Sequence, residues 1–119
     1  ATKDDEAQAR AAIKAVADAE EANVPLPCAL EFVWVLQRVY RLSRHEVAQA
    51  LGTLLRMPNL KTDVAAVTTG LQVHLAGGDF ADGVIAAAGA SMGSEKFVSL
   101  DRRAVTRLRE IGIAAELLK

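Results

Sequence analysis

Apolar residues recur at helical spacing along most of the chain, and short apolar stretches separate these segments. Spacings of three and four residues predict helices over residues 4–22, 43–57, 64–76, 79–92 and 101–111. Residues 28–40 are almost wholly apolar and too long for one strand. They are therefore predicted to form a buried helix, with Cys28 and Trp34 in the core.

Local signals predict where the helices begin and end. Ser43 and Glu46 have the spacing of a capping box, and glycines at 77, 78, 93 and 112 end the segments before them. Strands are predicted over residues 24–27, 60–62, 96–100 and 113–118. Helices thus alternate with short strands, which indicates an α/β fold with a parallel sheet covered on both faces.

Composition narrows the function classes. The chain has 119 residues, enough for one domain over residues 1–119, and a formal net charge of −1, so bulk charge does not favour nucleic-acid coating. Aromatic residues are only 4 %, which argues against a base-stacking sheet. A single cysteine excludes internal disulfides and multi-cysteine zinc sites. No glycine-rich phosphate loop follows a strand, so a small-molecule α/β enzyme is disfavoured.

Neither a membrane span nor a signal peptide is predicted. No apolar run approaches the roughly 20 residues that a span needs. The opening residues 1–6 are acidic, whereas a signal peptide begins with basic and then apolar residues. We therefore expect a cytoplasmic protein.

Two carboxylates stand in apolar helical surroundings. Glu31 and Asp82 have no basic residue three or four positions away. A carboxylate on an apolar helix is rarely buried unless its charge is compensated. The compensation is expected from the tertiary fold or from a bound ion.

A third acid, Asp101, directly follows the best predicted strand, and Ser99 precedes it by two residues. Ligands of parallel α/β folds bind beyond the carboxyl ends of the strands. Oxygen ligands from separate elements suit Mg²⁺ or Mn²⁺, which would support phosphodiester hydrolysis.

Structural roles compete with each of these assignments. Asp101 also fits the N-cap of the helix that follows it, and Asp79 with Asp82 fits an acidic pair at a helix start. Glu31 also fits a bridge to a distant arginine. Arg102 and Arg103 belong to a basic cluster with positions 107 and 109, which is either a solvated face or, beside Asp101, a phosphate contact.

The two histidines are expected to be structural. His45 is predicted on an exposed first turn, and His74 on a helix surface or as a satisfied residue. Neither has a Cys or His partner at ligand spacing.

Three acidic segments, taken in order, resemble a known family. Residues 30–36, 78–87 and 97–102 are similar to the second, third and fourth acidic motifs of PIN-domain ribonucleases of the VapC toxin type. Residues 40–46 are also similar to the connecting segment of these toxins. The resemblance extends over essentially the whole chain.

This resemblance implies a three-layer α/β/α fold and a metal-dependent endoribonuclease, cytoplasmic, dimeric and inhibited by a cognate antitoxin. RNA would be its substrate, and Mg²⁺ or Mn²⁺ its cofactor. Glu31, Asp82 and Asp101 would be the catalytic, metal-binding acids. Asp79 would be an accessory metal ligand, Ser99 would support Asp101, and Arg102 and Arg103 would contact RNA.

The chain departs from the family at its start. The family's first acidic motif, Asp-Thr-Asn on the central strand of the sheet, has no counterpart here. We therefore expect a PIN-like domain that lacks its first strand. Two functions stay open: a ribonuclease toxin, and a catalytically impaired domain that binds an antitoxin or a dimer partner.

Overall fold

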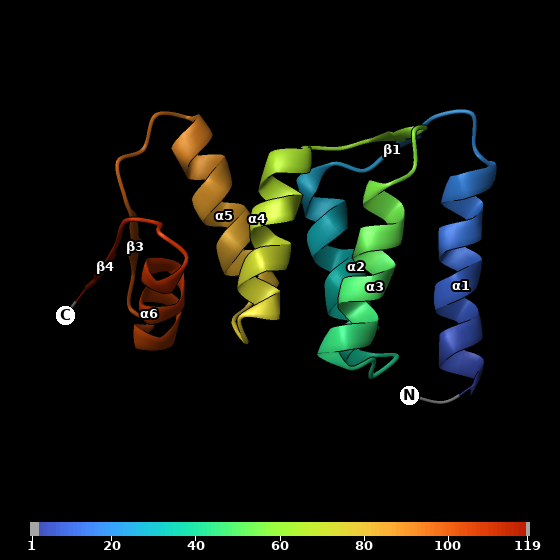
Figure 1. Cartoon of the computed structure of the whole chain (residues 1–119), viewed down its shortest axis with the longest axis horizontal. Helices are drawn as coiled ribbons and strands as arrows, with labels where there is room; N and C mark the ends of the chain where they lie inside the picture. The colour runs from blue at the N-terminus through green and yellow to red at the C-terminus, as the bar shows by residue number, and fades with distance from the viewer. Residues whose placement is uncertain (1–2, 119) are drawn as a thin grey trace. The chain divides into compact units, whose positions relative to one another are not determined.

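The computed structural model describes residues 3–118, so Ala1, Thr2 and Lys119 of the predicted domain lie outside the described residues. Six helices alternate with four short strands in this part of the chain (Figure 1). The chain divides into two compact units, Ala1–Val64 and Ala65–Lys119. The predicted alternation of helices and parallel strands is confirmed in a mostly helical α/β structure.

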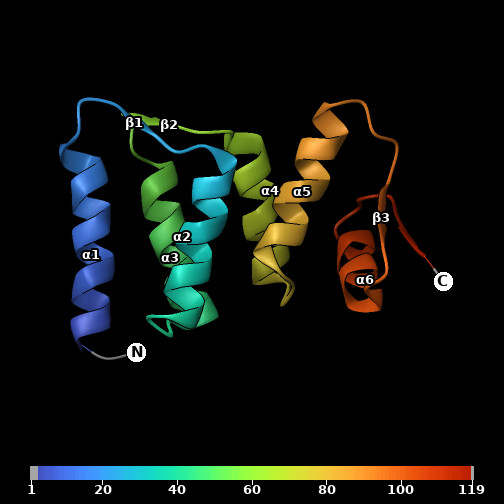
Figure 2. The same cartoon turned by 180° about the vertical axis from the view of Figure 1, so that it is seen from behind.

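The first unit is a small helical cluster with one pair of strands. Its helices are α1 (Lys3–Asp18), α2 (Leu26–Arg38) and α3 (Arg44–Leu55), and both α1 and α2 pack against α3. Strands β1 (Ala22–Asn23) and β2 (Leu60–Lys61) pair in parallel (Figure 2). The buried apolar side chains of this unit are Ala9, Ala29, Val33, Leu36, Val47, Ala50, Leu51 and Leu54.

Side-chain caps set helix ends in this unit. The predicted capping box is confirmed: Glu46 N–H donates to Ser43 Oγ at 3.1 Å, and Ser43 N–H donates to Glu46 Oε1 at 2.9 Å. These hydrogen bonds lower the pKa of Glu46. Asn59 caps the C-terminal end of α1: its Nδ2 donates hydrogen bonds to the carbonyls of Val16 and Ala19.

Two predictions about the segment around α2 are wrong. The strand expected at 24–27 is shifted to Ala22–Asn23, because α2 already begins at Leu26: Pro25 is its N-cap, and Pro27 lies in the first helical turn, where proline is tolerated. The helix is also not wholly buried: Cys28 is exposed, and Trp34 is 57 % exposed. Only one face of α2 is buried, and an all-apolar segment does not reveal which one.

The second unit combines three helices with a second pair of strands. Its elements are α4 (Val64–Leu75), α5 (Phe80–Ser91), β3 (Phe97–Ser99), α6 (Arg102–Glu110) and β4 (Ala115–Leu117). Helix α6 packs against both strands and contacts α5. A core of Val73, Ala86 and Leu108 is covered by the partly buried side chains of Phe97, Ile111, Ile113 and Ala115.

Helices α4 and α5 approach each other at two glycines. A Cβ on Gly83 would lie 2.7 Å from the Gly70 Cα and 2.9 Å from the Thr69 carbonyl oxygen. A Cβ on Gly70 would lie 2.6 Å from Val84 Cγ2. These positions therefore have no room for a side chain, and the contact sets the distance between the two helices.

The strands form two pairs and not the single sheet expected. Within residues 3–118, β1 pairs with β2 and β3 with β4, both in parallel, and no described strand joins the pairs. Each strand has only two or three residues, so each ladder contains few hydrogen bonds. The parallel orientation is thus confirmed, while the single sheet is not.

The histidines fit their structural expectations. His45 is exposed at the start of α3, and His74 is fully buried in α4. In the described part of the chain, no buried side-chain nitrogen or oxygen lacks a hydrogen-bond partner.

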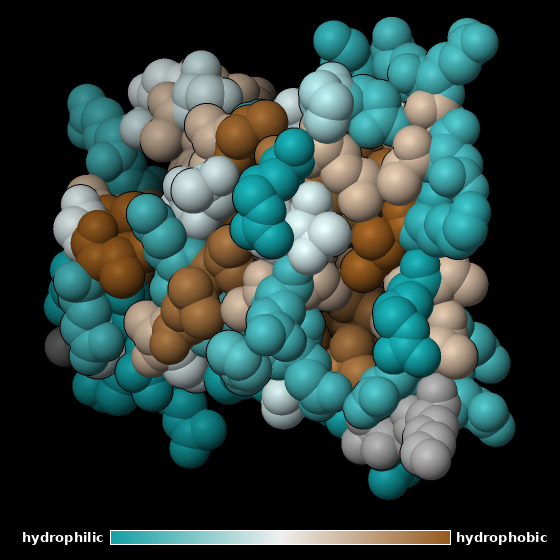
Figure 3. All heavy atoms as spheres, turned by 45° about the vertical axis from the view of Figure 1, so that its right-hand side comes forward, coloured by the Kyte–Doolittle hydropathy of each residue, from teal (hydrophilic) through white to brown (hydrophobic). Residues whose placement is uncertain are grey.

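Apolar side chains also remain on the surface, where brown patches interrupt the teal in Figure 3. Val39, Leu75, Ile85 and Leu100 are among the large apolar residues that are more than half exposed. None of the helices described in residues 3–118 has the length and hydropathy of a transmembrane span.

The close approach of α4 and α5 at Gly83 predicts that a larger residue at this position destabilises the protein. Replacing Gly83 with Ala should lower the free energy of unfolding by about 1–3 kcal/mol, because the new methyl group meets backbone atoms. Gly89 is a matched control in the same helix, since its Cβ would lie 3.6 Å from the nearest atom. Gly89→Ala should raise the free energy of unfolding by about 0.5–1 kcal/mol. Urea denaturation followed by circular dichroism measures both, and equal effects would contradict the packing argument.

Candidate functional site

The first turn of α5 carries two of the predicted acids. Gly77 has a φ of 94°, which glycine adopts readily, so the chain turns sharply after α4. Asp79 is then the N-cap of α5, and its Oδ1 accepts a hydrogen bond from Ala81 N–H at 3.0 Å. Asp82 follows in the first helical turn and is partly buried.

The end of β3 carries the third acid. Asp101 is the N-cap of α6, and its Oδ1 accepts hydrogen bonds from Arg103 N–H at 2.9 Å and Ala104 N–H at 3.4 Å. Ser99 Oγ accepts a hydrogen bond from Asp101 N–H at 3.0 Å. The capping role of Asp101 is confirmed, and Ser99 fixes the backbone that carries this carboxylate.

Three carboxylates of the second unit interact electrostatically. Burial raises the pKa of Asp82 above its ordinary value of 3.8, and the negative charges of Asp79 and then Asp101 raise it further. The start of α5 and the strand-to-helix junction before α6 therefore bring Asp79 and Asp101 close enough to Asp82 to disfavour its charged form. Asp79, Asp82 and Asp101 are called the acidic cluster below; the predicted set of acids also contained Glu31, which does not act on the pKa of Asp82.

Glu31 lies in the first unit, on α2. Its side chain is exposed, on the same solvent-facing side of the helix as Trp34. Its apolar neighbours in the sequence predicted a carboxylate that needs compensation. Because Glu31 faces water, its charge needs no protein partner.

The acidic cluster offers only carboxylate oxygens as possible metal ligands. Among residues 3–118, no group of three or more His, Cys, Asp or Glu side chains is arranged to hold a metal ion. The donors of the acidic cluster nevertheless suit a hard divalent cation, since all are carboxylate oxygens. Asp79 and Asp101 each use Oδ1 for capping, which leaves Oδ2 for a ligand. A cation would also relieve the repulsion that raises the pKa of Asp82.

The arginines of α6 divide into two kinds. Arg102 and Arg103 are exposed in the first turn, directly after Asp101. Arg107 Nη1 donates to the carbonyl of Ala76 at 2.7 Å, and Arg109 Nε donates to the carbonyl of Ala115 at 2.9 Å. The structural use of these last two was missed from the sequence, where all four read as one basic cluster.

The raised pKa of Asp82 predicts a pH-dependent gain in stability for Asp82→Asn. Because the folded-state pKa lies above 3.8, ionisation of Asp82 opposes folding as the pH rises through the folded-state value. The variant should therefore be more stable than the parent at neutral pH, by about 0.5 kcal/mol after solvent screening. Below pH 3.8 the difference should vanish. Urea denaturation at several pH values measures this.

Glu95→Gln is the matched control for this experiment, because Glu95 is exposed and its replacement removes the same charge. Equal stabilisation by both changes would show that net charge, and not local repulsion at Asp82, determines the effect.

Comparison with known proteins identifies the family. No curated protein and no solved structure matches the chain. The family model described as PIN domain matches residues 1–111. PIN domains are generally nucleases, and they typically use divalent metal ions. Since the match covers nearly all of the 119 residues, the chain belongs to the PIN domain family.

Proposed function

We propose that this PIN domain is a ribonuclease of the VapC toxin type, which hydrolyses RNA phosphodiester bonds with Mg²⁺ or Mn²⁺. Its catalytic acids are Asp82 and Asp101, with Glu31 as a third and Asp79 as an accessory ligand. The proposal places the protein in the cytoplasm as a homodimer, held inactive by a cognate antitoxin. The single observation that carries it is the placement of three acids at helix starts of one unit: Asp79 and Asp82 at the start of α5, and Asp101 at the start of α6, with both neighbours raising the pKa of Asp82.

The roles of these side chains follow from their settings. A divalent cation, when bound, would activate a water and stabilise charge on the phosphoryl group. Asp101 is held rigidly by its own cap and by Ser99, so its Oδ2 is presented in a fixed position. Asp82 is the acid whose charge is most disfavoured without a cation. Its ionisation and cation binding are therefore coupled.

The first turn of α6 supplies the RNA contacts in this proposal. Arg102 and Arg103 are exposed beside Asp101, and arginine binds phosphate through paired N–H groups. A phosphate held there would lie next to the carboxylates. The formal net charge of −1 means that such a local basic turn, and not bulk charge, would attract RNA.

A second candidate function is partner binding without catalysis. The observation that favours it is the exposure of Trp34 and Val39 at α2, which are 57 % and 52 % exposed. Large exposed apolar side chains are typical of protein-binding surfaces. In this alternative the domain holds an antitoxin or a dimer partner and the acids have only structural roles.

The nuclease proposal predicts metal-dependent RNA cleavage. The purified chain should cleave a mixed RNA substrate in Mn²⁺ and not in EDTA. Asp82→Asn should lower the rate by at least about 100-fold, because a neutral amide binds a divalent cation far more weakly than a carboxylate does. Gel electrophoresis of end-labelled RNA measures the rates.

Glu95→Gln serves as the control, since it removes an exposed carboxylate outside the acidic cluster. Asp101→Asn separates capping from catalysis, because asparagine caps a helix as well as aspartate does. It should fold normally and yet fail to cleave. An inactive parent chain that still binds a partner protein through Trp34 would favour the second function.

The proposed RNA contacts predict a change in salt dependence. Replacing Arg102 and Arg103 with Ala should weaken RNA binding and reduce the slope of log K against log salt by about 0.7 for each phosphate that the variant no longer neutralises. Arg10→Ala on the exposed surface of α1 is the control and should leave the slope unchanged. Fluorescence anisotropy with labelled RNA at several salt concentrations measures the slopes. Equal slopes in all three proteins would exclude this turn as the RNA site.

A further inference from the structure

The C-terminal end of α4 is closed by a Schellman motif of backbone hydrogen bonds. Gly78 N–H donates to the Val73 carbonyl at 2.9 Å, and Gly77 N–H donates to the His74 carbonyl at 3.0 Å. The positive φ of Gly77 is the one that this motif requires. The two glycines therefore end α4 and form the turn that leads into α5.

Arg107 of α6 adds a side-chain hydrogen bond to the same helix end. Its Nη1 donates to the Ala76 carbonyl at 2.7 Å, which the two backbone hydrogen bonds of the motif do not use. The dipole of α4 also favours a cation at its C-terminus. The ion pair of Arg107 with Glu110 is 3.7 Å long and partly exposed, so it contributes little. The Ala76 carbonyl is therefore the main polar partner of Arg107.

The side chain of Arg107 also covers the two glycines. A Cβ on Gly77 would lie 3.3 Å from Arg107 Nη2, and a Cβ on Gly78 would lie 3.3 Å from Arg107 Cγ. The guanidinium group thus lies against Gly77, and the aliphatic stem lies against Gly78. Glycine loses more conformational freedom on folding than any other residue. Arg107 therefore contacts the turn where the chain most needs an external constraint.

This turn leads directly into the acidic cluster. Asp79 follows Gly78 and caps α5, and Asp82 lies in the first turn of that helix. Asp101 caps the helix that carries Arg107, about 9 Å away along its axis at a rise of about 1.5 Å per residue. One side chain therefore connects the two helix starts that carry the acids.

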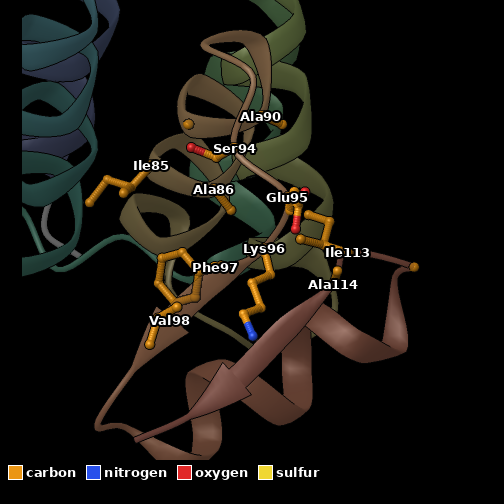
Figure 4. A pocket seen from close by; sticks show the side chains of 12 residues that line it. Ile85, Ala86, Ala90, Ser94, Glu95, Lys96, Phe97, Val98, Ile113 and Ala114 are labelled. Carbon is orange, nitrogen blue, oxygen red and sulfur yellow. The ribbon is translucent and has the colours of Figure 1, made fainter.

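Close packing is interrupted farther along α5. A cavity of about 580 Å³ extends past Ile85 and Ala86 of α5 to Phe97 of β3 and Ile113 before β4 (Figure 4). The first turn of α5 does not line this cavity. Because the middle of α5 is not closely packed on this side, the orientation of α5 relative to α6 depends more on the contacts near its start.

We propose that Arg107 is a positioning residue of the acidic cluster. By holding the Gly77–Gly78 turn, it fixes Asp79 and Asp82 relative to Asp101 on its own helix. This inference rests on the proposed function, in which these carboxylates bind one divalent cation and must therefore keep defined separations. Arg107 itself contacts neither the cation nor the RNA in this proposal.

Titration of the full chain with Mn²⁺, in the absence of RNA, tests the proposal. Electron paramagnetic resonance measures the free Mn²⁺ and hence the dissociation constant. Arg107→Met keeps an aliphatic stem over Gly78 and removes the donor to Ala76. The affinity for Mn²⁺ should fall about tenfold, as is typical when a group that orients metal ligands is lost. An unchanged affinity would overturn the proposal, and a direct contact of Arg107 with RNA would give that result.

Arg109→Met is the matched control. Arg109 lies on the same helix, and its Nε donates to the Ala115 carbonyl at 2.9 Å, at β4 and not at the turn before α5. The change removes the same charge and one hydrogen bond to a carbonyl, so its affinity for Mn²⁺ should stay close to that of the parent. Equal losses in Arg107→Met and Arg109→Met would assign the effect to charge or to global stability and would overturn the proposal.

Amide hydrogen exchange followed by NMR gives a readout that needs no metal. The N–H groups of Ala81 and Gly83 donate to the Oδ1 and the carbonyl of Asp79. In Arg107→Met both should exchange about fivefold faster, the change expected when one hydrogen bond no longer holds the turn. The amide of Arg103, which Asp101 caps, should keep its rate.

This readout separates the inference from the function on which it rests. A parent chain that binds no Mn²⁺ would count against the proposed function, and hydrogen exchange would then decide on Arg107 alone. Faster exchange at Ala81 and Gly83 would support the positioning role, and equal exchange in the parent and Arg107→Met would overturn it.

Discussion

Two glycines control the geometry of the second unit. Gly70 and Gly83 let the backbones of α4 and α5 meet without intervening side chains. The first turn of α5, which carries Asp79 and Asp82, is thereby fixed against α4. Arg107 adds a second constraint from α6, because it donates to the Ala76 carbonyl at the end of α4. Three helices are thus tied together around the turn that holds the acids, and the position of each carboxylate follows from backbone packing.

Within this frame, the candidate site uses helix termini for two purposes. Asp79 and Asp101 each satisfy backbone N–H groups that a helix start leaves without partners. The same caps hold the second carboxylate oxygens of Asp79 and Asp101 at defined positions, where the proposed cation would bind. Asp82 differs because it lies inside a helical turn and caps nothing. Its raised pKa reflects burial and the two neighbouring charges.

Much of this arrangement could be predicted from the sequence, because caps and breaks are local. The capping box of Ser43 and Glu46 was predicted from spacing alone. The predictions that were wrong depend on tertiary contacts, which the local sequence does not reveal. An apolar run such as residues 28–40 does not indicate which face meets the core, so Trp34 was assigned to the interior and lies outside. Pro25 fits a strand and a helix start equally well, and tertiary context decided for the helix.

Strand pairing was the second feature that could not be predicted from the sequence. Each strand has two or three residues, which is too little pattern to indicate neighbours, and the two separate pairs could not be distinguished from one sheet. The roles of Arg107 and Arg109 were hidden for a similar reason, since their carbonyl acceptors lie on segments that only the fold brings near.

Asp101 caps α6 and, in the proposed nuclease, would also bind the cation, and this double use would restrict which amino acids its position can accept. Helix capping admits serine, threonine, asparagine or aspartate, because each offers a short side-chain acceptor. Neutralising a divalent cation at the proposed site would require aspartate or glutamate, because each offers an anionic oxygen. Only aspartate belongs to both sets. Replacing Asp101 with glutamate would keep the negative charge but weaken the helix cap. Replacing it with serine would keep the cap but remove the negative charge. In the proposed nuclease, helix capping and cation binding would thus both require the same residue type at this one position.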